Sequence, residues 1–120
     1  MKEFDHPACE DISLSTVLAA LGDPVRLSIV QQLLADPREV PWGAIEVDVG
    51  KATLSHHMKT LRSAGLIKHR KVGTRCFIAL RSEFDSLFPG LLNSIVLARA
   101  REMSRDNVPE NTCDLLSSGI

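Results

Sequence analysis

Residues 51–80 read KATLSHHMKTLRSAGLIKHRKVGTRCFIAL, and the spacing of their apolar residues changes after Gly65. Before Gly65 the apolar residues recur at intervals of three and four, which predicts a helix that ends near Gly65. Those on its core face are Leu54, Met58 and Leu61. After Gly65 two runs that alternate with period two flank a turn containing Gly73, which predicts a β-hairpin. A helix that leads directly into a hairpin is the second half of a winged helix-turn-helix fold.

Two amphipathic helices are predicted ahead of this stretch. The first carries an apolar stripe, and we expect Gly22 to end it in the left-handed conformation that glycine adopts at little cost. The stripe consists of Leu14, Val17, Leu18 and Leu21. Asp23 is expected to be the N-cap of the second helix and Pro24 its first residue, and Asp36-Pro37 closes it.

The other elements follow from weaker patterns. Residues 40–45, which include Pro41 and Gly43, predict a short and irregular third helix. Residues 91–103 predict a last amphipathic helix. The expected fold is therefore mainly α with a small β-hairpin (α+β), a winged helix-turn-helix. We expect an N-terminal arm at 1–11, this domain at 12–103, and a flexible C-terminal tail at 104–120.

Length and composition restrict the class of protein. The chain has 120 residues, of which 44% are hydrophobic and 24% charged, as in one globular domain. No window holds the roughly 18 consecutive apolar residues of a membrane span. The first residues are acidic where a signal peptide would be apolar, and three widely spaced cysteines make no disulfide framework. We therefore expect a cytoplasmic protein with no membrane partner.

The near-neutral net charge of −1 hides three unlike regions. Residues 51–81 contain eight Lys and Arg and no acidic residue. Residues 1–50 have a net charge of −6, and residues 82–120 have a net charge of −3. The basic block coincides with the predicted helix and hairpin, which is the charge pattern of a polyanion-binding face.

The helix within the basic block is the predicted DNA-reading element, because such a helix enters the major groove. Its candidate DNA contacts are Lys51, Ala52, Thr53, Ser55, His56 and Lys59. His57 lies at the edge of the core face and is expected to be a packed, hydrogen-bonded histidine. In the hairpin, the candidate phosphate contacts are Lys68, Arg70, Lys71 and Arg75.

Three phrases of the sequence resemble the ArsR (ArsR/SmtB) family of bacterial regulators. They are LAALGDPVRL at 18–27, TLSHHMKTL at 53–61 and AGLI at 64–67, within a match that covers about residues 12–101. The resemblance implies a homodimer through the first and last helices, and repression at a palindromic double-stranded DNA operator until an inducer binds. The apolar stripes that fit such an interface are Leu14, Val17, Leu18, Leu91, Leu92, Ile95 and Val96.

The known sensing sites of that family do not carry over to this chain. The Cys-x-Cys pattern would fall near residues 42–48, where there is no cysteine, and Trp42 stands where a related branch often has a thiol. Residues 91–103 lack the Asp and His of the other common metal site. We expect no resident cofactor. A thiol or soft-metal site from Cys9 and Cys113 is the remaining alternative, since both flank the helices of the implied dimer.

Two function classes stay open on the sequence alone. The first is a dimeric DNA-binding repressor released by an inducer or a thiol signal. The second is a winged-helix module that binds a protein partner and has no specific affinity for DNA. An enzyme is not expected, because no nucleophile–base set, phosphate-cradling glycine loop or paired carboxylates can be identified.

Overall fold

A computed structural model describes residues 4–105 of the chain. It contains five α-helices, two short 3-10 helices and three strands. The helices are α1 (Leu14–Leu21), α2 (Pro24–Ala35), α3 (Lys51–Ser63), α4 (Phe84–Leu87) and α5 (Leu91–Arg105), and the 3-10 helices are η1 (Cys9–Asp11) and η2 (Trp42–Ala44). The strands are β1 (Val40–Pro41), β2 (Ile67–Val72) and β3 (Arg75–Leu80).

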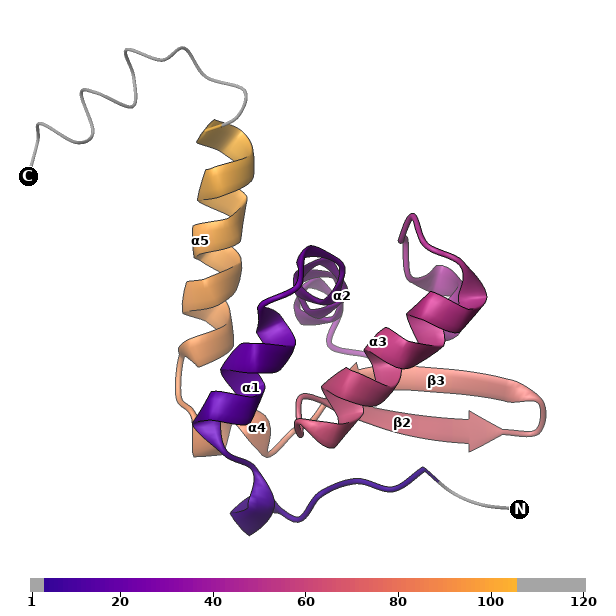
Figure 1. Ribbon diagram of the computed structural model, residues 1–120. Coiled ribbons are helices and arrows are strands. Elements are labelled where there is room, and N and C mark those ends of the chain that lie inside the picture. Colours follow the sequence, from indigo (N-terminus) through magenta and orange to yellow (C-terminus); the bar gives the residue numbers. More distant parts are fainter. Residues whose placement is uncertain (1–3, 106–120) are drawn as a thin grey trace, which may run out of the picture.

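The elements form a winged helix-turn-helix. Helices α1, α2 and α3 pack together, and the hairpin of β2 and β3 extends from the end of α3 (Figure 1). Helix α5 contacts α2 and lies at the opposite end of the molecule from the hairpin turn (Figure 1). The predicted fold class, the helix at 51–63 and the hairpin are therefore confirmed.

Local sequence explains where the first two helices begin. The Ser13 side chain accepts a hydrogen bond from the backbone N–H of Thr16, which caps α1. The Asp23 carboxylate accepts from the N–H groups of Val25 and Arg26 at 2.8 and 3.2 Å, which confirms it as the N-cap of α2. Those hydrogen bonds counteract the burial of the carboxylate, and the pKa of Asp23 lies below its ordinary value.

The predicted left-handed conformation of Gly22 is wrong. Its φ is −77°, and its N–H donates to the carbonyl of Ala19 at 3.2 Å. This hydrogen bond, to the residue three positions earlier, ends α1, and Asp23 directly begins the cap of α2. The chain therefore turns between the helices without a residue in the left-handed conformation. The two helices meet with a bend of 103°.

The predicted third helix at 40–45 is also wrong in part. Val40 and Pro41 form an edge strand that pairs antiparallel with Ile78 and Phe77, and only η2 is helical. The sheet order is β1-β3-β2, so the wing has three strands instead of two. Proline lacks a backbone N–H, and the outer edge of a sheet is where a strand tolerates it.

The C-terminal half holds two further differences from the prediction. The one-turn helix α4 was not predicted, and its Phe84 is buried with its ring 5.2 Å from that of Phe88. Helix α5 runs to Arg105, two residues beyond the predicted end at Met103. Residues 106–120, which include most of the predicted tail, lie outside the described residues.

The core lies between the three N-terminal helices and one face of the sheet. Its fully buried side chains are Val17, Ile29, Val30, Leu33, Met58, Leu61, Leu66, Ile67 and Ile78. Residues of α3 and β2 thus share one core, which holds the helix and the wing together. Among residues 4–105, no single helix is long and apolar enough to cross a membrane; α1 and α2 pass that test only as a bent pair.

Candidate nucleic-acid interface

Helix α3 has one polar face that is exposed and one apolar face that is buried in the core. Met58 and Leu61 are fully buried, and Leu54 is half-buried, as the periodicity predicted. All six candidate contacts on this helix are exposed: Lys51, Ala52, Thr53, Ser55, His56 and Lys59. These side chains are thus available to a ligand, while the core fixes the orientation of the helix that carries them.

A buried polar contact anchors α3 to the first two helices. His57 is 8% exposed, and its Nδ1 lies 3.0 Å from Nη1 of Arg26 on α2. The Arg26 Nε donates to the carbonyl of Ala20 at the end of α1, at 2.6 Å. Because a guanidinium only donates, His57 Nδ1 accepts this hydrogen bond. The prediction that His57 is a packed structural histidine is confirmed.

A groove of about 430 Å³ lies between α1 and α3, beside this anchor. Its lining is Thr16, Ala19, Ala20, Arg26, His56, Lys59, Thr60, Ser63 and Ala64. Three of these side chains are basic or can become so, and none is acidic. The exposed face of α3 therefore continues into a groove that contains no acidic side chain.

The wing carries its cations mostly on one face. Lys68, Arg70 and Arg75 lie on the face that also holds Phe77, because Arg70 pairs with Phe77 and Val72 with Arg75. Lys71 lies on the opposite face, next to the turn. Gly73 adopts φ of 62° in that two-residue turn. All four predicted wing residues are exposed, and they extend along the strands toward the tip.

Arg70 has an acidic partner that the sequence analysis did not identify. Its Nε and Nη2 donate to the two carboxylate oxygens of Glu39 at 2.8 and 2.6 Å. The guanidinium holds the pKa of Glu39 below its usual range. Glu39 precedes the edge strand β1, so the third strand is what places this carboxylate next to the wing.

The Glu39→Gln variant is expected to bind unrelated double-stranded DNA about two- to threefold more tightly, because the charge of Arg70 is no longer neutralised. In a salt titration, the slope of log K against log salt should steepen by up to about 0.9, the contribution of one phosphate contact. Glu46→Gln makes the same charge change at an exposed residue away from Arg70. Equal effects of the two variants would show that Arg70 is not involved.

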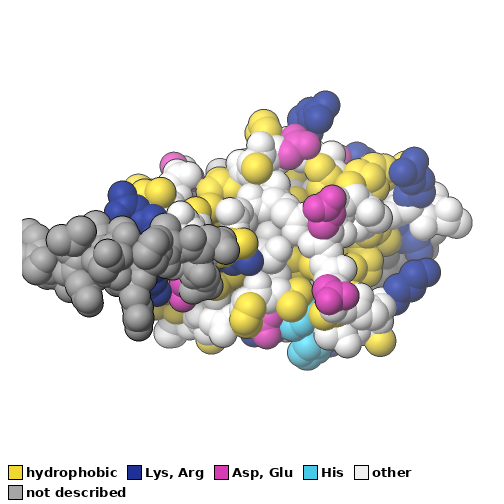
Figure 2. All heavy atoms as spheres, turned by 90° about the horizontal axis from the view of Figure 1, so that it is seen from above, with side chains coloured by type: hydrophobic (Ala, Val, Ile, Leu, Met, Phe, Trp, Pro, Cys, Tyr) yellow, Lys and Arg dark blue, Asp and Glu magenta, His cyan; other side chains and the backbone are white. Residues whose placement is uncertain are grey.

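Two other cations of the basic block point inward. Arg62, on the last turn of α3, lies with Nη1 3.1 Å from Nδ1 of His69. Arg81, directly after β3, is 11% exposed and pairs with Glu83. The cations left exposed are Lys51, Lys59, Lys68, Arg70, Lys71 and Arg75. Figure 2 shows Lys and Arg side chains gathered at the end of the molecule where the hairpin turn lies.

His69 of β2 is the centre of a buried polar cluster. It is 4% exposed, and its Nε2 accepts from the indole N–H of Trp42 at 2.7 Å. Burial first, and then the positive charges of Arg62 and His6, lower the pKa of His69 to about 4. Both ring nitrogens face donors, Trp42 at Nε2 and Arg62 at Nδ1, and a neutral imidazole can accept from only one of them. Protonation would remove that last acceptor, so the folded protein holds this ring neutral.

The free energy of unfolding is therefore expected to fall as the pH is lowered from 6.5 towards 4. In that range the unfolded state binds a proton at His69 that the folded state does not bind. The stability that comes from keeping His69 neutral is therefore fully present above pH 6.5, declines below it, and is lost once the pH falls below the folded pKa of about 4. Urea unfolding of the wild type and of His69→Gln at several pH values measures this difference. Parallel pH dependences of the two proteins would contradict the assignment.

Two of the three cysteines, Cys9 and Cys76, lie within the described residues. Cys9 begins η1, and its Sγ lies 3.6 Å from Nη2 of Arg81. Cys76 is half-buried in β3, and Cys113 lies outside the described residues. Within residues 4–105, no group of three His, Cys, Asp or Glu side chains could hold a metal ion. A pairing of Cys9 with Cys113 stays a prediction.

The predicted dimer residues divide into three sets by their exposure. Val17 is fully buried and Leu92 is 7% exposed, so both pack within the core of their own chain. Leu14 and Leu18 on α1 are 46% and 48% exposed, and on α5 the exposed leucine is Leu97, at 58%, which was not among the predicted residues. Leu91, Ile95 and Val96 are half-buried and pack against the core. The outer face of α1 and that of α5 thus keep apolar side chains in solvent.

Comparison with known proteins gives a consistent result. A sequence profile described as "Helix-turn-helix domain" matches residues 21–70. The uncharacterized HTH-type transcriptional regulator YceK of Bacillus subtilis (strain 168) is 33% identical over 72% of this chain and 89% of its own length. The arsenical resistance operon repressor of Staphylococcus xylosus is 39% identical over 59% and 68%, respectively. The crystal structure of the transcriptional repressor BigR from Xylella fastidiosa matches with a TM-score of 0.55 at 27% identity, over 72% of this chain and 85% of that one.

Proposed function

This chain belongs to the ArsR/SmtB family of helix-turn-helix transcriptional regulators, and we propose that it represses transcription by binding a double-stranded DNA operator. The observation that carries the proposal is the exposed polar face of α3, seated on a buried apolar base next to a basic wing. In this proposal the repressor leaves the operator when an inducer binds.

The two parts of the interface would make different contributions. The first two turns of α3 would enter the major groove, where Ser55 and His56 can hydrogen-bond base edges and the Ala52 methyl can contact a thymine methyl. Lys51 and Lys59 would hold phosphates beside them. The wing cations would contact the flanking backbone, which adds affinity that depends on salt and not on sequence.

We further propose that the active form is a homodimer through α1 and α5. The support is the set of large apolar side chains that remain exposed on the outer faces of these helices, with Leu14 and Leu18 on one and Leu97 on the other. A two-fold dimer would present two copies of α3, which matches a palindromic operator with half-sites about one helical turn apart.

Leu18→Asp is expected to give a monomer, because it places a charge in the proposed apolar interface. Val72→Asp is the matched control, since Val72 has the same 48% exposure but lies on the wing. Sedimentation velocity of the two variants and the wild type measures the oligomeric state. A Leu18→Asp protein that sediments like the wild type would exclude α1 from the interface.

The DNA-binding function is tested by fluorescence anisotropy with the segment upstream of the protein's own gene and an unrelated duplex of equal length. We expect a preference of at least about 1,000-fold for the upstream segment, with an affinity that falls steeply as salt rises from about 50 to 200 mM. Absence of binding to both duplexes at low salt would instead support the alternative, a winged-helix module that binds a protein partner.

A further inference from the structure

Residues 4–9, called here the docked segment, lie against the base of the wing and the end of α3 (Figure 1). The ring of Phe4 stacks on the imidazole of His69, with centroids 3.8 Å apart and planes inclined by 13°. The guanidinium of Arg62 lies 4.8 Å from the centroid of the same Phe4 ring, and its Nε donates to the carbonyl of Asp5 at 3.1 Å. One side chain of α3 thus holds the segment by two contacts.

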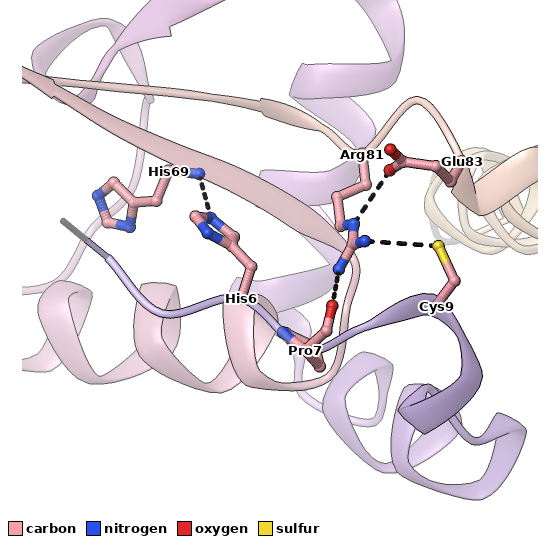
Figure 3. A network of polar contacts seen from close by, with 6 residues as sticks. All are labelled: His6, Pro7, Cys9, His69, Arg81 and Glu83. Atoms are coloured by element: carbon pink, nitrogen blue, oxygen red, sulfur yellow. Dashed lines mark hydrogen bonds and ion pairs between the residues drawn. The ribbon is translucent and has the colours of Figure 1, made fainter.

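The next residues of the segment hold the edge of the sheet. His6 Nε2 accepts from the backbone N–H of His69 at 2.9 Å (Figure 3). Strand β2 is at the edge of the sheet, so this N–H points away from β3 and needs a partner from outside the sheet. Arg81, beyond the end of β3, donates to the carbonyl of Pro7 at 2.5 Å and contacts Cys9 (Figure 3).

These contacts join three parts of the DNA-binding unit through a segment far away in the sequence. Arg62 lies in the last turn of α3 and His69 lies in β2. Arg81 is the residue that directly follows β3. The same contacts leave the Arg81 side chain 11% exposed and Arg62 half-buried, so both guanidinium groups are less available to a polyanion than the exposed cations of the wing.

We propose that the docked segment is a clamp that fixes the wing relative to α3, and that Phe4, His6 and Arg62 are positioning residues for operator recognition. The proposal rests on the DNA-binding function proposed above. Fixing the wing favours simultaneous contacts of α3 with base edges and of the wing with phosphates. Docking also withdraws two cations from unspecific binding. Both effects raise the ratio of operator affinity to affinity for unrelated DNA.

Docking can be measured without DNA, because Trp42 is the only tryptophan of the chain and its indole donates to the ring on which Phe4 stacks. We expect Phe4→Ala and His6→Ala to change the emission of Trp42, with far-UV circular dichroism unchanged. Phe4→Tyr keeps the ring, and His6→Gln keeps an acceptor for the N–H of His69, so both should retain the wild-type emission. Unchanged emission in both alanine variants would overturn the docking itself.

The second measurement is the ratio of the two dissociation constants, for the upstream duplex and for the unrelated one. Phe4→Ala and His6→Ala should lower this preference about fivefold, mainly by weakening binding to the upstream duplex. Phe4→Tyr and His6→Gln should restore it. A preference that stays unchanged in the alanine variants, or an equal loss on both duplexes, would overturn the positioning role.

The two proposals can fail separately. If the wild type binds neither duplex, the repressor function fails, and the Trp42 emission of the variants still decides whether the segment docks. If the wild type binds the upstream duplex selectively and the alanine variants bind it equally well, only the clamp fails.

Discussion

Ser55→Ala and His56→Ala are each expected to weaken binding to the upstream duplex by about fivefold to a hundredfold, while affinity for unrelated DNA changes little. The physical reason is that a good contact to a base edge contributes roughly 1–3 kcal/mol of discrimination, and both side chains lie exposed on the second turn of α3. Fluorescence anisotropy with both duplexes at fixed salt measures the effect.

Two controls make this result specific to α3. Ser86→Ala removes a hydroxyl that is also exposed, from α4 outside the proposed interface, and should bind DNA as the wild type does. Sedimentation velocity should show the same oligomeric state for all variants. If Ser55→Ala and His56→Ala both bind the upstream duplex as tightly as the wild type, another element must read the sequence.

Gly65→Ala is expected to lower the free energy of unfolding by about 2–4 kcal/mol, the largest stability effect at any glycine of residues 4–105. Gly65 has φ of +88°, and its N–H donates to the carbonyl of Arg62 while Leu66 donates to Leu61, which is the glycine-ended cap of α3. A Cβ at this position would lie 2.5 Å from Cδ1 of Ile12. Urea unfolding measures the loss.

A double-mutant cycle separates the two causes of this loss. In an Ile12→Ala background the contact disappears, so Gly65→Ala should there cost only the left-handed backbone, about 1–2 kcal/mol. Gly43→Ala is the matched control, because its φ is not positive and a Cβ there meets nothing within 4 Å. A Gly65→Ala protein as stable as the Gly43→Ala protein would contradict this explanation.

The glycine at 65 also shows why the helix and hairpin were predictable. At that residue the apolar side chains change from a spacing of three and four to a spacing of two. Each spacing indicates which side chains of its element face the shared core. The caps at Ser13 and Asp23 are equally local, since a cap bonds to N–H groups two or three residues ahead. The same reasoning failed at Gly22, because a glycine at a helix end permits the left-handed conformation without requiring it.

The elements that were missed depend on distant partners. Val40 and Pro41 have no strand periodicity of their own and form a strand only because β3 offers its second edge. Glu39 meets Arg70, and Phe4 meets His69, across long separations in the sequence. A charge count over residues 51–81 treats Arg62 and Arg81 as available cations, whereas in the fold both donate to backbone carbonyls of the docked segment.

The sequence by itself determined the winged helix-turn-helix, the six exposed residues of the helix proposed to contact DNA, and the basic character of the wing. These follow from periodicity, caps and local charge, which act over a few residues. Only the tertiary structure decided which cations remain exposed, which acid neutralises Arg70, and that residues 4–9 lie against the wing. Such contacts form between segments that the core brings together, and no local pattern encodes their meeting.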